Sequence, residues 1–140
     1  MKKPLLLTLV TTVLILCSFS CKKAIEKKQE QLVLEAMTNG TWIVEQYLEG
    51  ATNVTSEFLD YNFQFFKNGT VTGTLNGAAT SGTWSGDASN YSITSQFPGA
   101  ADPLKKLNGV WKIKDSYWDF VKAEMNTTNG VNIVRLRKNP

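Results

Sequence analysis

The sequence predicts an all-β fold: an antiparallel barrel of about eight strands, with an N-terminal helix and a short helix near residues 102–108. Three observations lead to this prediction. From Thr41 onward, polar and apolar residues alternate in short runs, which is the two-residue period of a strand with one buried face. Asn-Gly pairs, which favour tight hairpin turns, separate several of these runs. Large aromatic residues occupy many of the apolar positions and can supply a core.

The predicted strands follow one another with short connections. The clearest pair is a hairpin, in which YNFQFF alternates, Lys67-Asn68-Gly69 breaks the pattern, and TVTGTL resumes it. Closing the sheet removes its exposed edges, and about eight strands enclose an interior filled by side chains or by one small ligand. The predicted strands are 41–49, 60–67, 70–76, 81–86, 90–97, 109–115, 117–124 and 131–138.

The short helix is predicted from DPLKKLNG (102–109). Asp102 is placed to cap its first turn, Pro103 suits the first helical position, and the two leucines share one face. A second turn is predicted at SEFLDY (56–61). The glycine-rich piece at 76–86 lacks the lysine and the following helix of a phosphate loop, so we interpret it as a strand connection.

Strand parity indicates which side chains face the interior. Trp42, Val44 and Leu48 share one face of the first strand. Tyr117 and Trp118 are neighbours in a predicted strand, so one of them should lie near solvent or an interface. The inward aromatics form a packed core or line a pocket for an apolar ligand. The candidate interior residues are Trp42, Tyr61, Phe63, Phe65, Trp84, Tyr91, Trp111, Trp118 and Phe120.

Residues 1–20 have the layout of a secretory signal peptide. Lys2 and Lys3 give a positive start, and an apolar stretch runs from Leu5 to Leu16 before a short, mostly small segment. That stretch is shorter than the roughly 20 apolar residues that a membrane-spanning helix needs, so a transmembrane anchor is the weaker interpretation.

Cys21 follows the leader directly and resembles the acylated cysteine of a bacterial lipobox, with small Ser20 before it. Ser18 and Phe19 depart from the usual lipobox pattern. The alternative is an ordinary cleaved leader that leaves Cys21 as a free thiol. Cys17 would leave with the leader and Cys21 would carry lipid, so the mature chain would have no free thiol left to form a disulfide.

The tether at residues 21–38 is predicted to be a lipidated, basic segment that continues as a helix packed on the domain at 39–138. Residues 22–32 carry four basic and two acidic side chains, whereas residues 33–140 carry nine and ten. The positive charge therefore belongs to the leader and tether, where the lysines can contact anionic head groups. A nucleic-acid module would show a basic patch on the folded part, so we expect no nucleic-acid partner.

Five motifs together resemble the lipocalin-like domains of Bacteroidota lipoproteins, over residues 39–138. These are NGTWIVEQYLEG, FQFFKNGTVTGTL, SGTWSGDASNYSITSQF and LNGVWKIKD, followed by a final VNIVRLRK. The Gly40-Thr41-Trp42 opening is similar to the lipocalin Gly-x-Trp, whose tryptophan closes the barrel base. The resemblance implies that Arg135 or Arg137 packs over that tryptophan. The chain is shorter than a full lipocalin and lacks its disulfide, so ligand binding is an analogy at the level of the fold.

Residues for catalysis are scarce. The chain has no histidine, which removes the usual general base and the commonest metal ligand, and no Gly-x-Ser-x-Gly elbow. We therefore expect no enzymatic activity, no metal and no cofactor. The remaining carboxylates are expected to be solvated surface acids or parts of turns: Glu57 with Asp60, Asp115 with Asp119, and Asp87 beside Ser89 and Asn90.

These observations favour a non-catalytic binding module, anchored through Cys21 to the outer membrane. The ligand would be a small apolar or amphipathic molecule in the barrel mouth. The alternative is a solid-cored interaction protein that binds a protein or a glycan through Tyr117 or Trp118. Lys22 and Lys23 stand where surface-exported lipoproteins of Bacteroidota often carry acidic residues, so the periplasmic face is favoured over the cell surface.

Overall fold

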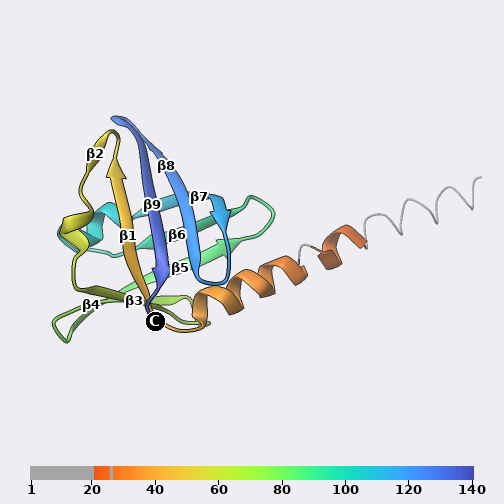
Figure 1. The fold of residues 1–140 in the computed structure, drawn as a ribbon. Helices are drawn as coiled ribbons and strands as arrows, with labels where there is room; N and C mark the ends of the chain where they lie inside the picture. Colours follow the sequence, from red (N-terminus) through yellow and green to blue (C-terminus); the bar gives the residue numbers. More distant parts are fainter. Residues whose placement is uncertain (1–20, 26) are drawn as a thin grey trace, which may run out of the picture.

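The computed structural model describes residues 21–25 and 27–140, and in this part of the chain eight strands close into an antiparallel barrel (Figure 1). A ninth strand of two residues adds to the first. The predicted all-β barrel with an N-terminal helix is confirmed. The strands are β1 Trp42–Glu49, β2 Thr52–Asn53, β3 Tyr61–Phe65, β4 Thr70–Leu75, β5 Ala78–Asp87, β6 Ser92–Gln96, β7 Gly109–Ser116, β8 Phe120–Thr127 and β9 Gly130–Lys138.

The barrel closes because its first and last long strands pair. β1 pairs with β3, each of the strands β3 to β8 pairs with the next in sequence, and β9 returns to β1, with Val44 opposite Leu136. Tight turns allow this order. Asn76 and Gly77 both have positive φ, 50° and 83°, which is the backbone that an Asn-Gly hairpin turn requires. No long edge strand is left unpaired in the ring.

Two strands begin three residues away from their predicted starts, and the other starts agree within two residues. β5 begins at Ala78, so part of the glycine-rich piece is strand instead of connection. β8 begins at Phe120, three residues later than predicted, because residues 117–119 form the turn after β7. The backbone N–H of Tyr117 donates to the Phe120 carbonyl over 2.9 Å and closes this turn. Tyr117 and Trp118 therefore lie in a turn, and both are exposed.

A bulge in β1 changes which residues reach the core. The register between β1 and β9 shifts between Val44 and Gln46, which inserts one extra residue and reverses the parity beyond it. Tyr47 is consequently fully buried, whereas Leu48, the predicted core residue, is only partly buried. The inward aromatics pack closely. Phe65 and Trp84 meet edge to face with ring centroids 5.3 Å apart.

The N-terminal helix covers one end of the barrel. Residues 21–25 and 27–38 are helical, and the side chains described from 21 to 32 are exposed. Met37, in the last turn, is buried, and its carbonyl accepts the indole N–H of Trp42 over 2.9 Å. In the part of the chain that the structure describes, no helix is long and apolar enough to cross a membrane.

We call the two ends of the barrel the helix end and the far end. The helix end consists of residues 33–41 with the loops at 66–69, 87–91 and 117–119, since the strands that meet these loops all terminate beside the start of β1. The far end carries two 3-10 turns, η1 Thr55–Phe58 and η2 Leu104–Leu107. The helix predicted near 102–108 is thus η2, which begins later than expected and has no side-chain cap from Asp102.

Candidate functional site

The barrel interior is almost filled by side chains. It encloses a cavity of about 50 Å³, lined by apolar residues from most of the strands and by Met37 of the helix. Ligand pockets for small organic molecules usually measure about 300 Å³ or more. The interior therefore lacks the room for such a ligand, and the candidate interior aromatics act as a core.

The structure places most of the predicted interior residues inside. Trp42, Phe63, Phe65, Trp84 and Trp111 are buried, and Tyr61 is partly buried and stacked on Phe63 with ring centroids 5.8 Å apart.

For three candidate interior residues the prediction is wrong. Tyr91 is 60 % exposed, in a turn with positive φ just before β6, and Trp118 is 49 % exposed. Phe120 lies outside the core because its neighbour Val121 occupies the inward position, and its ring faces the guanidinium of Arg135 at 4.5 Å.

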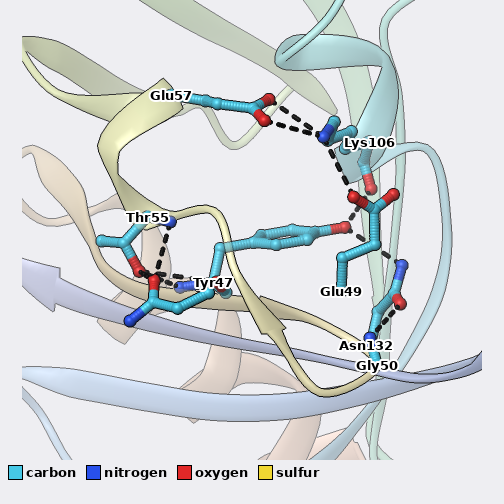
Figure 2. A network of polar contacts seen from close by, with 8 residues as sticks. Tyr47, Glu49, Gly50, Thr55, Glu57, Lys106 and Asn132 are labelled. Carbon is cyan, nitrogen blue, oxygen red and sulfur yellow. Dashed lines mark hydrogen bonds and ion pairs between the residues drawn. The ribbon is translucent and has the colours of Figure 1, made fainter.

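At the far end, hydrogen bonds fix η1 and η2 across the barrel (Figure 2). The hydroxyl of buried Tyr47 donates to the Lys106 carbonyl over 2.8 Å and accepts from the Asn132 amide over 3.4 Å. The Tyr47 backbone N–H donates to the Thr55 hydroxyl over 2.9 Å. One residue, through its backbone and its side chain, thus joins β1, both 3-10 turns and β9. Burial raises the pKa of Tyr47 to about 12.

Ion pairs also connect the two 3-10 turns at the far end. The ammonium of Lys106 lies 3.1 Å from a carboxylate oxygen of Glu49 and 2.9 Å from one of Glu57 (Figure 2). Hydrogen bonding to Glu57 and then to Glu49 raises the pKa of Lys106. Glu57, which we predicted to be a solvated surface acid, therefore serves as a partner of η2.

The helix end differs from the far end in that the helix leaves open grooves along its sides. One groove with a mainly apolar lining, of about 260 Å³, lies between the helix and the β7–β8 hairpin. We call it the hairpin groove. The helix contributes four residues to its wall, and the barrel contributes mainly apolar residues and the two aromatics of the turn. The lining residues are Leu32, Val33, Ala36, Met37, Ile93, Ile113, Ser116, Tyr117, Trp118 and Val121.

Further grooves flank the helix. One, of about 200 Å³, lies beside Tyr91 and Leu32, and another, of about 350 Å³, lies between the helix and the loop at 66–69. Asp87 stands at the rim of the first. The side chains of Asn90 and Ser89 donate to its carboxylate over 2.7 Å each and lower the pKa of Asp87 to about 2. This is the plain turn that the sequence predicted.

The arginines of β9 bind neighbours on the outer face of the barrel. Arg135 and Arg137 both pair with Glu45, and Arg137 also lies 3.2 Å from an Asp119 oxygen. The hydrogen bond from Arg137, together with the bond from Arg135 and both positive charges, lowers the pKa of Glu45 despite partial desolvation. The lipocalin resemblance implied that one of these arginines packs over Trp42, but neither does. Lys138 takes that position instead, with its ammonium 5.3 Å from the indole centroid.

The predicted anchor lies at the start of the helix. Cys21 is exposed and forms no disulfide in the described part of the chain. The predicted leader at residues 1–20 lies outside the described residues, so its assignment stays a prediction. The hairpin groove was not predicted, because the residue pattern does not show which loops lie beside the helix. The one available signal was the apolar spacing of Leu32 and Ala36 along the tether.

Comparison with known proteins supports the fold. No family model matches the chain, and no curated protein matches it. A solved structure, a DUF4847 family protein from Bacteroides vulgatus, matches with a TM-score of 0.54 and 13% sequence identity, covering 76% of this chain and 97% of that one. At this level of identity the match shows a shared barrel fold.

Proposed function

We propose that the protein is a non-catalytic, lipid-anchored binding module whose ligand site is the hairpin groove at the helix end. The ligand class is a small apolar or amphipathic molecule, as the sequence suggested. The site differs from the barrel mouth expected from the sequence, because the packed interior leaves the usable volume in the grooves beside the helix, among which the hairpin groove is lined by two exposed aromatic residues.

The observation that carries this proposal is the contrast between the two volumes. The hairpin groove measures about 260 Å³, close to the lower limit of ordinary ligand sites, and its walls are mostly apolar with a serine hydroxyl and a tyrosine at the rim. Burial of apolar area there would supply the affinity, at roughly 25 cal/mol per Å². Acylation of Cys21 would hold the module at the outer membrane, facing the periplasm.

A fluorescent fatty acid, cis-parinaric acid, tests the proposal. The full chain should bind the probe with increased emission, and Ala36→Phe should weaken binding about tenfold or more because the larger side chain fills the groove. Ala79→Phe adds the same side chain at an exposed position of β5 and should bind as the parent does. Equal binding by the Ala36 variant, or no binding by the parent chain, would contradict the proposal.

A second function, binding of a protein or glycan partner, is favoured by the exposure of Tyr117 and Trp118 on one turn. Adjacent exposed aromatics are common anchors of interfaces and sugar platforms. Replacing both with serine should abolish recovery of that partner by the tagged, lipidated chain, and unchanged recovery would exclude this function.

A further inference from the structure

Exposed aromatic side chains gather at one end of the barrel. Across residues 21–25 and 27–140, four aromatic residues are exposed, namely Phe66, Tyr91, Tyr117 and Trp118. All four lie in the three loops of the helix end. The exposed large apolar residues toward the far end are aliphatic: Leu59, Val110 and Val131. The exposed aromatic residues therefore lie at the end of the barrel from which the helix projects (Figure 1).

The helix continues the same apolar surface outward. Ile25 and Leu32 are 59 % and 46 % exposed and stand seven residues apart, which places them on one face of the helix. Leu32 lines the hairpin groove together with Tyr117 and Trp118, so the stripe on the helix meets the aromatic turn directly. Neither part is covered by another segment of the described chain.

The charges on the helix beside this surface are mainly basic, and Asp119 in the aromatic turn is paired with Arg137. Lys22, Lys23, Lys27 and Lys28 are all exposed on the helix, and the expected acylation site, Cys21, precedes them. A helix with an apolar stripe, flanking lysines and nearby Tyr and Trp has the composition of a segment that lies at a membrane surface. Tyrosine and tryptophan suit the boundary between head groups and acyl chains because each joins an apolar ring to a polar group.

We propose that Ile25, Leu32, Tyr117 and Trp118 form a docking surface that lies on a phospholipid bilayer, so that the helix end of the barrel faces the membrane. The exposed helix rises about 1.5 Å per residue, so an acylated Cys21 would lie within roughly 17 Å of Leu32. Acyl chains at that distance would hold the helix stripe and the aromatic turn close to the bilayer. Their contact with the lipid would then be favoured by a high effective concentration. The inference does not require the groove to hold a separate ligand.

The tryptophans of the chain give this surface its own reporter. Of the four, Trp42, Trp84 and Trp111 are buried inside the barrel, and Trp118 alone is substantially exposed. Lipids with brominated acyl chains quench a tryptophan only at short range. Quenching of the purified full chain, reconstituted in phosphatidylcholine vesicles with and without phosphatidylglycerol, therefore reports on Trp118.

We expect brominated vesicles to remove roughly a quarter of the tryptophan emission, the share of one residue in four, and Trp118→Phe to abolish the difference. Combined Ile25→Ser and Leu32→Ser substitutions should also abolish it while leaving Trp118 in place. Leu59→Ser, an equally exposed aliphatic position at the far end, should leave it unchanged.

Two outcomes would overturn the inference: no quenching in either lipid mixture, or quenching that persists in the double serine variant. A self-associating surface would appear as a concentration-dependent dimer in sedimentation without quenching, which also counts against it. Ala36→Phe separates this test from the proposed function, because it should lose cis-parinaric acid binding and keep the quenching of Trp118.

Discussion

The two ends of the barrel cover the core in different ways. At the far end, η1 and η2 are held by the Tyr47 hydroxyl and by the ion pairs of Lys106. At the helix end, one helix packs through Met37 and leaves grooves on its flanks. Buried, satisfied hydrogen bonds fix one geometry, whereas a few apolar contacts leave a cover that is easier to open. The difference indicates that the far end is the more firmly held cover of the core, and the proposed binding sites lie at the helix end.

The strongest test of this comparison uses a tyrosine from each end. Tyr47→Ala should lower the free energy of unfolding by about 3–5 kcal/mol, because it removes a fully buried ring and its hydrogen bonds. Tyr117→Ala should change it by less than about 0.5 kcal/mol, since that ring is 69 % exposed. Urea denaturation measures both. Similar losses in the two variants would break the distinction between the ends.

Met37→Ala should have the next largest effect. It removes the one helix side chain that reaches the barrel cavity, and we expect a loss of about 2–4 kcal/mol of unfolding free energy. Because Met37 lines both the cavity and the hairpin groove, the variant should also bind more cis-parinaric acid. Leu32→Ala is the matched control and should barely alter stability. An unchanged unfolding curve for Met37→Ala would show that the helix does not cap the barrel.

Alkaline pH offers a measurement specific to the far end. The folded protein raises the pKa of Tyr47 from about 10 to about 12, so folding favours the neutral phenol. This stability is fully present below pH 10 and is lost as the pH rises to 12, by up to about 3 kcal/mol. Tyr47→Phe has no proton to lose and should show a shallower decline over this window. Identical declines in the two proteins would exclude Tyr47 as the cause.

The smallest expected effect is that of Lys106→Met. The ion pairs with Glu49 and Glu57 lie near the surface, where such pairs contribute about 1 kcal/mol or less, and the unbranched apolar side chain of methionine keeps part of the packing of the lysine stem. Thermal unfolding at low and high salt measures the change. A loss as large as that of Tyr47→Ala would show that the ion pairs, and not the phenol, hold η2.

The barrel was predictable because the chemistry that specifies it is local. Alternating polarity and Asn-Gly turns locate strands such as β3 and β4, and short connections make them neighbours. The bulge between Val44 and Gln46 was not predictable, since no turn signal marks it, and it exchanged Leu48 for Tyr47 in the core. The prediction for Trp118 was wrong for a related reason. Its apolar character predicted burial, whereas the turn at 117–119 places its side chain outside the barrel.

The hairpin groove could not be predicted from the sequence, for a different reason. It depends on where the helix lies relative to the β7–β8 hairpin, and residues from Leu32 to Val121 meet only after the ring has closed. Helical periodicity identified Leu32 and Ala36 as one face, but it could not say what that face contacts.

The pairing of β1 with β9 has a consequence for how the chain is made. Its partners, Trp42 and Lys138, stand at the two extremes of the domain, so the ring cannot close on the ribosome until β9 has been synthesised. Until then the nascent chain exposes unpaired strands. A chain that folds only after its last strand has been made can still pass unfolded through a translocation channel, which is compatible with the export signal predicted at residues 1–20.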